Sequence, residues 1–554
     1  MGSITAAAFR AHSGREHNMA TALDLLRQGR RDEIWQKYCG FIDLSLDEFM
    51  QIQERLLLEQ LHLLGTCELG RRLLGGRVPA TVEEFRQSVP LTTYADYADY
   101  LTAKREDVLP VKPECWLHTS GRTGQYQYKW VPYTPQMVKR LYESTMGAMI
   151  LASCSRRGEF VFDEGDTVLF AVAPFPYMSG MVARACQAEF NFAFLPPLEE
   201  AEKMSFAERI QEGFRLALRD GIDAFYGAPS VLLRISEQFS KGAGSMKLST
   251  FFLHPRVLFR LLRGLVRSRL AGRNYLLPRD LWTVKCMIAG GTDVQLFRHQ
   301  IKEYWGHEVI EGFGCTEGGG LGMQLWNAKG LIFYPDTNFY EFIPEAEALR
   351  SRADPSFVPQ TVTLAQVQAG QRYELVFTNF LGGVFTRYRI GDIIEITTLH
   401  DDEINVHLPQ WTFYSRADDI IDLASFARLT EVTIWKAIER TGLPYVDWVA
   451  RKEYDGNAPV LRLYLEPKDQ QLDAAQVRDR INAALTEVNS DYADLKSMLD
   501  MDPLRVSLLS QGTFQRYMLA RQAEGVDLAR LKPTHVNPSD AVVSKLLQAS
   551  GQAV

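Results

Sequence analysis

Residues 283–317 read TVKCMIAGGTDVQLFRHQIKEYWGHEVIEGFGCTE. Two short apolar runs in this stretch, Thr283–Ile288 and Glu308–Phe313, have the length and composition of buried β-strands. A similar run, Thr167–Ala173, occurs earlier in the chain, and amphipathic helical segments alternate with these runs. This alternation predicts an α/β fold in which helices pack on a largely parallel sheet.

The sequence on either side of this central region has a different character. Near the N-terminus, Ser45-Leu46-Asp47-Glu48 is a capping box before an amphipathic run, which predicts helices. Beyond about Asp418, the segments Val446–Tyr454 and Val460–Leu465 predict a β-hairpin, and Asp473 caps an amphipathic helix. We therefore predict a small α+β module behind a large α/β body.

The composition is that of a soluble globular protein. Hydrophobic residues make up 46% of the 554 residues, charged residues make up 23%, and the net charge is −7, which disfavours bulk electrostatic binding to nucleic acid. No two of the seven cysteines have C-x-x-C spacing, so neither a disulfide framework nor a zinc ribbon is indicated. We find no secretory signal and no apolar run that could span a membrane, and we expect a cytoplasmic protein.

Several common catalytic motifs are absent from the sequence. It contains no G-x-S-x-G elbow, no H-E-x-x-H, no G-x-x-x-x-G-K-[ST] and no strict G-x-G-x-x-G after a predicted strand. These absences disfavour ordinary serine hydrolases, zincins, P-loop NTPases and Rossmann dehydrogenases.

Four motifs that could bind a nucleotide are present, in a defined order. The first is Thr119-Ser120-Gly121-Arg122-Thr123-Gly124, which leads to Lys129. Hydroxyl groups and glycine amides in such a loop suit phosphate oxygens, although the same composition also fits a plain loop.

The second motif is Gly312-Phe313-Gly314-Cys315-Thr316-Glu317, with Gly290-Gly291-Thr292 upstream. An aromatic ring followed by small residues can stack on a purine, and the carboxylate that follows can bind Mg²⁺. A glycine-rich turn without a ligand is the alternative.

The third and fourth motifs lie nearer the C-terminus. Asp392 ends Thr386-Arg387-Tyr388-Arg389-Ile390-Gly391-Asp392, at a turn where a carboxylate can bind ribose hydroxyls or simply be solvated. Tyr414-Ser415-Arg416-Ala417-Asp418-Asp419 lies where the large body ends, and it fits either a hinge or a linker.

The order of these motifs resembles that of the adenylate-forming superfamily, which includes acyl-CoA synthetases, peptide-synthetase adenylation domains and luciferases. The sequence is most similar to the acyl acid–amido synthetases, the auxin- and jasmonate-conjugating family with its bacterial relatives. The similarity extends from about residue 50 to about residue 540. The matching stretches are Phe85–Thr93 with Tyr94, Phe339–Pro344, Tyr373–Val376 before Arg387–Arg389, Gly512–Phe514 and Gly525–Pro533.

The resemblance implies a role for each motif. Ser120, Gly121, Arg122 and Thr123 would bind ATP phosphates, and Glu317 would bind Mg²⁺. Asp392 would bind the ribose with help from Arg416, and Lys532 would neutralise charge during adenylation. The adenine and α-phosphate site would be lined by Gly291, Thr292, Phe313, Gly314 and Thr316.

The resemblance also implies an architecture and an activity. We expect an adenylate-forming domain over residues 1–415 with sheets, flanking helices and a small β-barrel-like part, a hinge at 416–422, and a mobile lid domain over 423–554. The expected enzyme is an AMP-forming ligase that uses ATP and Mg²⁺ to adenylate a carboxylic acid and passes the acyl group to an amine, an amino acid for example. An acyl-CoA ligase and a non-catalytic binding protein are the alternatives.

Several features leave alternatives open. Arg122 departs from the Thr or Ser usual in the phosphate loop, and Lys129 sits slightly later than its family counterpart. His118 is a candidate base for the amine or a structural residue. The acid, the acceptor and the oligomeric state cannot be read from the sequence. Five apolar or aromatic residues either line the acid pocket or belong to the core: Phe175, Tyr177, Met178, Phe225 and Tyr226.

One basic segment is not explained by the four motifs. Arg256, Arg260, Arg263 and Arg267 would form one face of a helix, opposite Leu258, Leu262, Leu265 and Val266. This face is either a surface for a membrane or a polyphosphate, or simply a solvated helix face.

Overall fold

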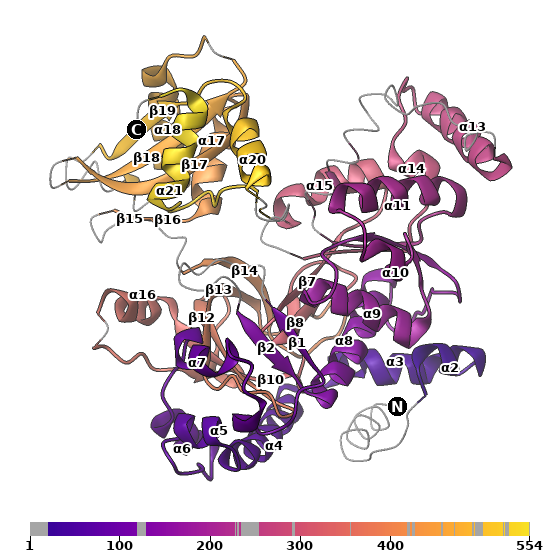
Figure 1. Ribbon diagram of the computed structural model, residues 1–554, viewed down its shortest axis with the longest axis vertical. Helices are drawn as coiled ribbons and strands as arrows, with labels where there is room; N and C mark the ends of the chain where they lie inside the picture. Colours follow the sequence, from indigo (N-terminus) through magenta and orange to yellow (C-terminus); the bar gives the residue numbers. More distant parts are fainter. Residues whose placement is uncertain are drawn as a thin grey trace. The chain divides into compact units, whose positions relative to one another are not determined.

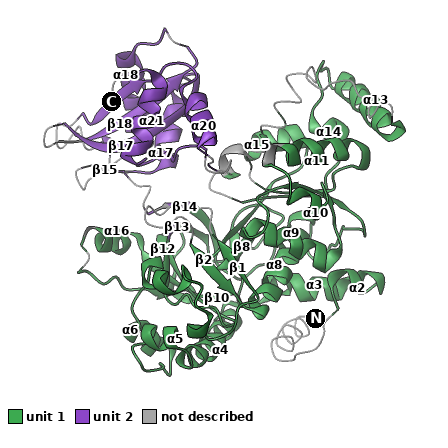
Figure 2. Ribbon diagram, in the orientation of Figure 1, with its two compact units in different colours: residues 1–390, 394–413 green, residues 391–393, 414–554 purple. Residues whose placement is uncertain are grey.

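The computed structural model describes most of the chain as two compact units (Figures 1 and 2). The described residues are 20–118, 129–227, 229, 232–233, 236, 254–290, 294–354, 356–417, 421–423, 427–455, 458–469, 471–489, 492–493, 502–524, 526 and 531–552. Unit 1 comprises Met1–Ile390 and Ile394–Phe413, and unit 2 comprises Gly391–Ile393 and Tyr414–Val554. The predicted domain boundary at 415 and the hinge at 416–422 stay predictions, and residues 418–420 of that hinge lie outside the described part.

Unit 1 is built on a sheet of twelve strands. Their order is β11-β10-β12-β13-β14-β9-β8-β7-β6-β5-β3-β4. The strands are β3 (Thr167–Ala171), β4 (Ala193–Leu195), β5 (Ala224–Gly227), β6 (Cys286–Ala289), β7 (Ile310–Cys315), β8 (Gly319–Gln324), β9 (Leu331–Phe333), β10 (Asn338–Pro344), β11 (Val362–Thr363), β12 (Arg372–Asn379), β13 (Tyr388–Thr398) and β14 (Gln410–Arg416). A separate pair is formed by β1 (Cys115–His118) and β2 (Trp130–Tyr133).

The predicted α/β class is confirmed, but the sheet is only half parallel. Strands β4, β3, β5, β6 and β7 pair in parallel, whereas β7 with β8, β8 with β9 and β10 with β12 pair antiparallel. For β7, β8 and β9 the physical reason is the length of the connections, because a short turn can join only antiparallel strands and a parallel pair needs a longer crossover.

Helices cover both faces of the parallel half of the sheet. Successive residues of β6 face opposite cores, since Cys286 and Ile288 pack in one and Met287 and Ala289 in the other. Helices α3, α8 and α9 line the first core, and α11 packs on β3 and β4 at the second. The helices of unit 1 are α2 (Ala22–Arg27), α3 (Arg31–Cys39), α4 (Leu46–Gly65), α5 (Glu68–Leu73), α6 (Val82–Ser88), α7 (Ala98–Leu101), α8 (Pro135–Ser153), α9 (Met178–Phe190), α10 (Leu198–Ala201), α11 (Phe206–Asp220), α13 (Pro255–Leu270), α14 (Pro278–Leu281), α15 (Val294–Trp305) and α16 (Glu345–Ala353).

Two of the predicted helix starts are present with their caps. Ser45 and Glu48 form the expected capping box at the start of α4, with Glu48 N 3.3 Å from Ser45 Oγ and Ser45 N 3.1 Å from Glu48 Oε2. Asp473 caps α18 by accepting a hydrogen bond of 3.1 Å from Gln476 N. These caps satisfy amide groups that the first helical turn leaves without partners.

Unit 2 is a small α+β domain with its own core. The predicted hairpin is confirmed, because β17 (Tyr445–Asp455) and β18 (Ala458–Pro467) pair antiparallel, and β18 pairs in parallel with β19 (Leu504–Leu508). A second sheet is formed by β15 (Ile421–Leu423) and β16 (Ala427–Leu429). The helices are α17 (Glu431–Arg440), α18 (Ala474–Val488), α20 (Thr513–Ala523) and α21 (Asp540–Ser550).

Candidate active site

The predicted site residues fall into three groups in the structure. Ser120, Gly121, Arg122, Thr123, Gly291 and Thr292 lie outside the described residues, as does the side chain of Arg416. Phe313, Gly314, Thr316 and Glu317 belong to unit 1, on β7 and the turn that follows it. Asp392 and Lys532 belong to unit 2.

The turn between β7 and β8 gives Glu317 its position. A Cβ atom on Gly314 would lie 2.6 Å from the carbonyl oxygen of Gly319, so only glycine fits where these two strands approach. Gly319 has φ +71°, a backbone conformation that favours glycine. Gly314 of the predicted purine motif and Gly319 beyond it therefore have a structural role in closing this turn.

Glu317 is the centre of a buried group of three polar side chains. Its side chain accepts a hydrogen bond of 3.1 Å at Oε1 from Tyr388 Oη, and Lys129 Nζ lies 3.4 Å from the same oxygen. Lys129 Nζ also donates to Tyr388 Oη over 3.2 Å. We call Lys129, Glu317 and Tyr388 the Glu317 group. It joins Lys129, which follows the first motif, to Tyr388, which lies within the third motif.

The tyrosine of this group is held as a hydrogen-bond donor. Burial, reinforced by the negative charge of Glu317, raises the pKa of Tyr388 well above its usual range. The phenol therefore stays protonated at physiological pH and donates to the carboxylate. Tyr388 was not predicted as a site residue, although it lies inside the motif that was read for Asp392.

Three side chains fix the backbone of the turn by binding successive carbonyl groups. Tyr133 Oη donates to Thr316 O over 2.9 Å, Asn379 Nδ2 donates to Glu317 O over 3.0 Å, and Asn338 Nδ2 donates to Gly318 O over 2.7 Å. Asn379 Nδ2 also donates to Asn338 Oδ1 over 2.9 Å, and both asparagines are buried. We call these contacts the carbonyl clamp. No motif in the sequence marks its three side chains.

The aromatic ring of Phe313 contacts two other rings. It stacks on Phe413 with 5.7 Å between ring centroids, and it meets Trp411 edge-on at 5.1 Å. Its predicted stacking on a purine stays a prediction.

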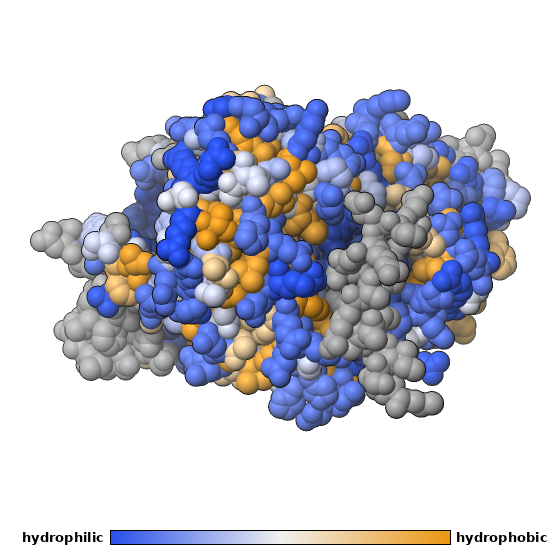
Figure 3. Space-filling view, turned by 90° about the horizontal axis from the view of Figure 1, so that it is seen from below, coloured by the Kyte–Doolittle hydropathy of each residue, from blue (hydrophilic) through white to orange (hydrophobic). Residues whose placement is uncertain are grey.

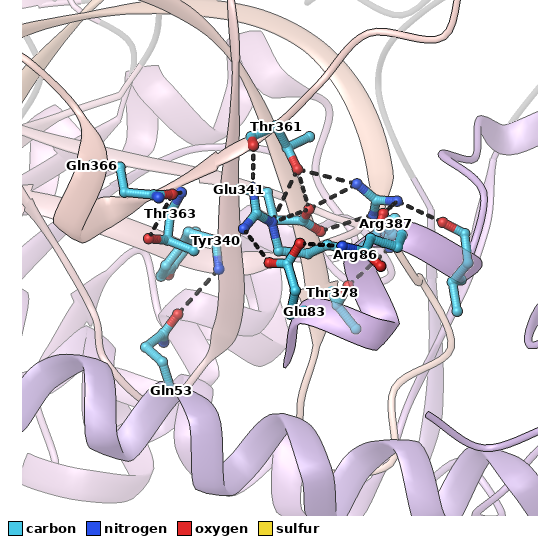
Figure 4. Close-up of polar contacts among 12 residues, drawn as sticks. Gln53, Glu83, Arg86, Tyr340, Glu341, Thr361, Thr363, Gln366, Thr378 and Arg387 are labelled. Carbon is cyan, nitrogen blue, oxygen red and sulfur yellow. Dashed lines mark hydrogen bonds and ion pairs between the residues drawn. The ribbon is translucent and has the colours of Figure 1, made fainter. Parts of the chain in front are cut away.

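The two arginines that flank Tyr388 bind buried carboxylates, and Figure 4 shows the pair of Arg387 with Glu341. Arg387 has φ +45° and pairs with Glu341 through Nη2 at 2.9 Å and Nε at 3.1 Å. Its Nη1 donates to the carbonyl oxygens of Arg86 and Val89, each over 2.6 Å. Arg389 pairs with Glu374 at 2.6 Å. These arginines anchor the strand, and Tyr388 between them points to Glu317.

Asp392 lies farther along β13 and is buried. The neighbouring Gly391 has φ +85°, and its carbonyl oxygen accepts a hydrogen bond of 2.7 Å from Ala417 N. Within unit 2 this bond joins the predicted ribose-binding segment to the residue after Arg416.

Lys532 is the exposed end of a chain of charged side chains in unit 2. Its Nζ lies 3.6 Å from Asp447 Oδ2, and its side chain is 60% exposed. His535 Nε2 is 2.8 Å from Asp447 Oδ1 and its Nδ1 is 2.5 Å from Glu431 Oε1, while the ring stacks on Trp448. Although burial lowers the pKa of His535, hydrogen bonds to Asp447 and Glu431 raise it to about 10.

The ion pairs of His535 predict that the stability of unit 2 depends on pH. The pKa of His535 is about 10 in the folded chain against 6.5 normally, so its stabilising charge is fully present below about pH 6.5 and is lost as the pH rises to 10. We expect His535→Gln to destabilise unit 2 at pH 6.5 and to have progressively less effect toward pH 10. Hydrogen exchange of peptides from β17 and β18 in both proteins measures this difference. A difference that does not change with pH would contradict the charged state.

The other candidate residues lie in packed surroundings. The His118 ring is buried, with its centroid 4.2 Å from that of Tyr177 and 5.1 Å from that of Trp130, and its role stays a prediction. Met178 Sδ is 3.3 Å from Tyr133 Oη, next to the carbonyl clamp. Phe225 is fully buried in the core that α11 covers, so of its two predicted positions, acid pocket or core, it occupies the core.

Glu317 is the candidate magnesium ligand, and its surroundings fit that role. No group of three or more His, Cys, Asp or Glu side chains that could hold a metal occurs among the described residues. Mg²⁺ beside a nucleotide typically has one or two carboxylate ligands, with phosphates and water as the others. Because Lys129 and Tyr388 both contact Oε1, Oε2 is the oxygen of Glu317 that could bind the ion.

The fold is that of adenylate-forming ligases. The chain superposes on a solved acyl acid amido synthetase, GH3.15, with a TM-score of 0.65 and 16% identity, over 96% of this chain and 97% of that one. It superposes on a solved 2-hydroxyisobutyryl-CoA ligase in the postadenylation state with a TM-score of 0.59 and 16% identity, over 91% and 92%.

Family comparisons define the chain more closely. Residues 40–173, 331–416 and 430–540 match the N-terminal, central and C-terminal domains of the GH3 family. The chain therefore belongs to the GH3 family, and the predicted family is confirmed.

Two curated relatives are amido synthetases. A jasmonoyl–L-amino acid synthetase of Nicotiana attenuata is 21% identical over 92% of this chain and 95% of its own. A jasmonoyl–L-amino acid synthetase of Oryza sativa subsp. japonica is 24% identical, and that match spans 38% of each chain. The names of these relatives describe ligases that join an acid to an amino acid, which agrees with the predicted class of ligase. No described helix is long and apolar enough to cross a membrane.

Proposed function

We propose that this chain is an ATP-dependent ligase that adenylates a carboxylic acid and transfers the acyl group to an amino acid. The observation that carries the proposal is the Glu317 group, which places a buried carboxylate beside a lysine in a chain of the GH3 family. The amido synthetase relative from Nicotiana attenuata, aligned over 92% of this chain, supports the amine as acceptor.

The reaction has two halves, an adenylation and an acyl transfer. An oxygen of the substrate carboxylate attacks the α-phosphorus of ATP, the bond to the β-phosphate oxygen breaks, and pyrophosphate leaves. The amine nitrogen then attacks the acyl carbon, the bond to the phosphate oxygen breaks, AMP leaves, and the amine loses a proton. The first half depends on positioning and charge neutralisation more than on acid–base catalysis.

The described residues supply parts of this machinery. Mg²⁺, when bound to Glu317, would neutralise charge on the phosphates. Lys129 supplies a second positive charge, and Tyr388 fixes the orientation of the Glu317 carboxylate. Asp392 would bind the ribose, Thr316 and the loop Ser120–Thr123 would bind phosphates, and Lys532 would stabilise the transferring α-phosphate.

Exchange of pyrophosphate into ATP across a panel of carboxylic acids, with hydroxylamine trapping, tests the proposal. Exchange that depends on one acid, followed by amide formation with an amino acid and release of AMP, is the expected result. Absence of exchange with every acid, in folded protein that binds ATP, would contradict the adenylation step.

An acyl-CoA ligase is the second candidate, and the structural likeness to 2-hydroxyisobutyryl-CoA ligase favours it. The two candidates differ only in the acceptor. Adding CoA and amino acids separately to trapped acyl-adenylate distinguishes a thioester product from an amide product.

Tyr388→Phe tests the Glu317 group. The substitution removes the hydroxyl that donates to Glu317 over 3.1 Å but keeps the buried ring. A hydrogen bond to a charged group contributes about 1.5–3 kcal/mol, so we expect acid-dependent exchange to fall about ten- to a hundredfold.

The matched control is Tyr373→Phe, which also removes a buried phenol, one that accepts a hydrogen bond from Gln368 N. Equal exchange rates in the two variants would show that Glu317 does not need the phenol of Tyr388.

A further inference from the structure

Helix α13 (Pro255–Leu270) carries an unusual concentration of exposed apolar side chains. Twelve large hydrophobic residues are exposed in the described chain, and half of them lie on this helix. By contrast, the face of the molecule in Figure 3 carries apolar residues in small groups among hydrophilic ones, which is ordinary for a protein surface. The exposed residues of α13 are Leu258 (42%), Phe259 (68%), Leu262 (61%), Leu265 (48%), Val266 (58%) and Leu270 (84%).

The buried face of α13 is formed by residues other than the exposed leucines. Val257, Gly264 and Ser268 face the protein, and a Cβ on Gly264 would lie 2.6 Å from Leu281 of α14. Arg260 also turns inward, where it donates to the carbonyl oxygens of Ala217 and Leu218. Glycine at position 264 allows α13 to pack this closely, and the leucine face is left outside.

The outer face has a regular apolar stripe. Phe259, Leu262, Val266 and Leu270 are spaced by three, four and four residues, so they align along one side of the helix. With about 3.6 residues per turn, this side is opposite Val257, Gly264 and Ser268. Figure 1 shows α13 at the outer edge of unit 1, beyond α14. We call the four residues the outer stripe.

The charged residues of α13 itself are all positive. Residues 238–279 contain nine Lys and Arg residues and no Asp or Glu, in a chain whose net charge is −7. Arg256, Arg263 and Arg267 flank the stripe on one side and Arg269 on the other, and all are exposed. Arg263, Arg267 and Arg269 form no ion pair with any described residue.

We propose that α13 is a docking helix for the surface of an anionic lipid bilayer. A helix with an apolar stripe bordered by arginines fits the boundary between lipid headgroups and acyl chains, where apolar side chains insert and cations meet phosphates. A free polyphosphate has no apolar groups that could pack against the outer stripe. A symmetric second copy would bring these arginines against one another.

Vesicle co-sedimentation of the full chain tests this docking. With vesicles of phosphatidylcholine and phosphatidylglycerol, the protein is expected to bind at low salt and to dissociate at high salt, because screening weakens the arginine contacts. It is expected to bind pure phosphatidylcholine vesicles weakly.

Two variants separate the apolar and the charged contributions. The serine variant combines Phe259→Ser, Leu262→Ser and Leu270→Ser, and the glutamate variant combines Arg263→Glu and Arg267→Glu. We expect each variant to lower binding to the anionic vesicles about tenfold or more. The control is Val358→Ser with Leu519→Ser, which removes exposed apolar side chains elsewhere and should bind like the unchanged protein. All these side chains are exposed, and circular dichroism melting checks the fold of each variant.

Three outcomes would overturn the proposal. One is no binding to the anionic vesicles at low salt, and another is binding by both α13 variants that equals the binding of the unchanged protein. The third is a dimer seen by light scattering that the serine variant abolishes while vesicle binding is unchanged, since the outer stripe would then be the interface between two copies.

Discussion

Arg387→Ala is expected to lower the free energy of unfolding of unit 1 by about 3–5 kcal/mol, because it removes the cation that contacts both oxygens of a buried carboxylate and leaves it with the more distant Arg86, whose Nε is 3.7 Å from Oε1. Glu341 is completely buried, and Arg387 contacts both of its oxygens. The change would also remove the donors to the carbonyl oxygens of Arg86 and Val89. The measurement is the shift of the urea unfolding midpoint, together with hydrogen exchange of peptides from β10 and β12.

The control for this prediction is Arg440→Ala, which breaks an exposed ion pair with Glu487 and should cost at most about 1 kcal/mol. The double variant Arg387→Met with Glu341→Leu should recover much of the loss, since it removes the buried charge as well. A change in Arg387→Ala no larger than that in Arg440→Ala would show that Glu341 is stabilised by other groups.

Lys532→Ala is expected to lower acid-dependent exchange of pyrophosphate into ATP about a hundred- to a thousandfold. This expectation rests on the proposed function, in which the lysine stabilises negative charge on the α-phosphate in the first half-reaction. The rate at which preformed acyl-adenylate reacts with the amine should change little. Both rates can be measured in the same preparation.

Lys545→Ala is the matched control, because Lys545 is also a partly exposed lysine of unit 2 that pairs with a carboxylate, Glu524. Its exchange rate should equal that of the unchanged protein. If Lys532→Ala slows both half-reactions equally, Lys532 has no specific role in adenylation.

The local patterns of the sequence predicted much of the fold. Alternation of apolar runs and amphipathic segments identified strands β3, β6 and β7, and the hairpin of β17 and β18 followed from two apolar segments around a turn. The pattern could not show that the sheet becomes antiparallel after β7, because the direction of a short buried strand depends on its connections rather than on its composition.

The candidate site was predicted less completely. The motif around Glu317 was visible because glycines, a threonine and a carboxylate are adjacent in the sequence. The partners of that motif are distant in the sequence, since Tyr133, Asn338 and Asn379 come from three other strands. Their signal is a buried polar side chain that binds a backbone group, and this is visible only in three dimensions.

Helix α13 illustrates a second limit of sequence patterns. Its sequence has apolar residues on two sides, and periodicity alone does not show which side packs against the protein. The decision depends on Gly264, which permits close contact with Leu281. The pattern therefore left the packed side of this helix undetermined.

The carbonyl clamp has a thermodynamic consequence for nucleotide binding. Because the carbonyl groups of Thr316, Glu317 and Gly318 are each bound by a side chain, the backbone of this turn loses its conformational entropy during folding. A ligand that arrives at Glu317 therefore meets a rigid turn and does not have to order it. Loosening the clamp would then weaken binding through a less favourable entropy, even though every group that touches the ligand is retained.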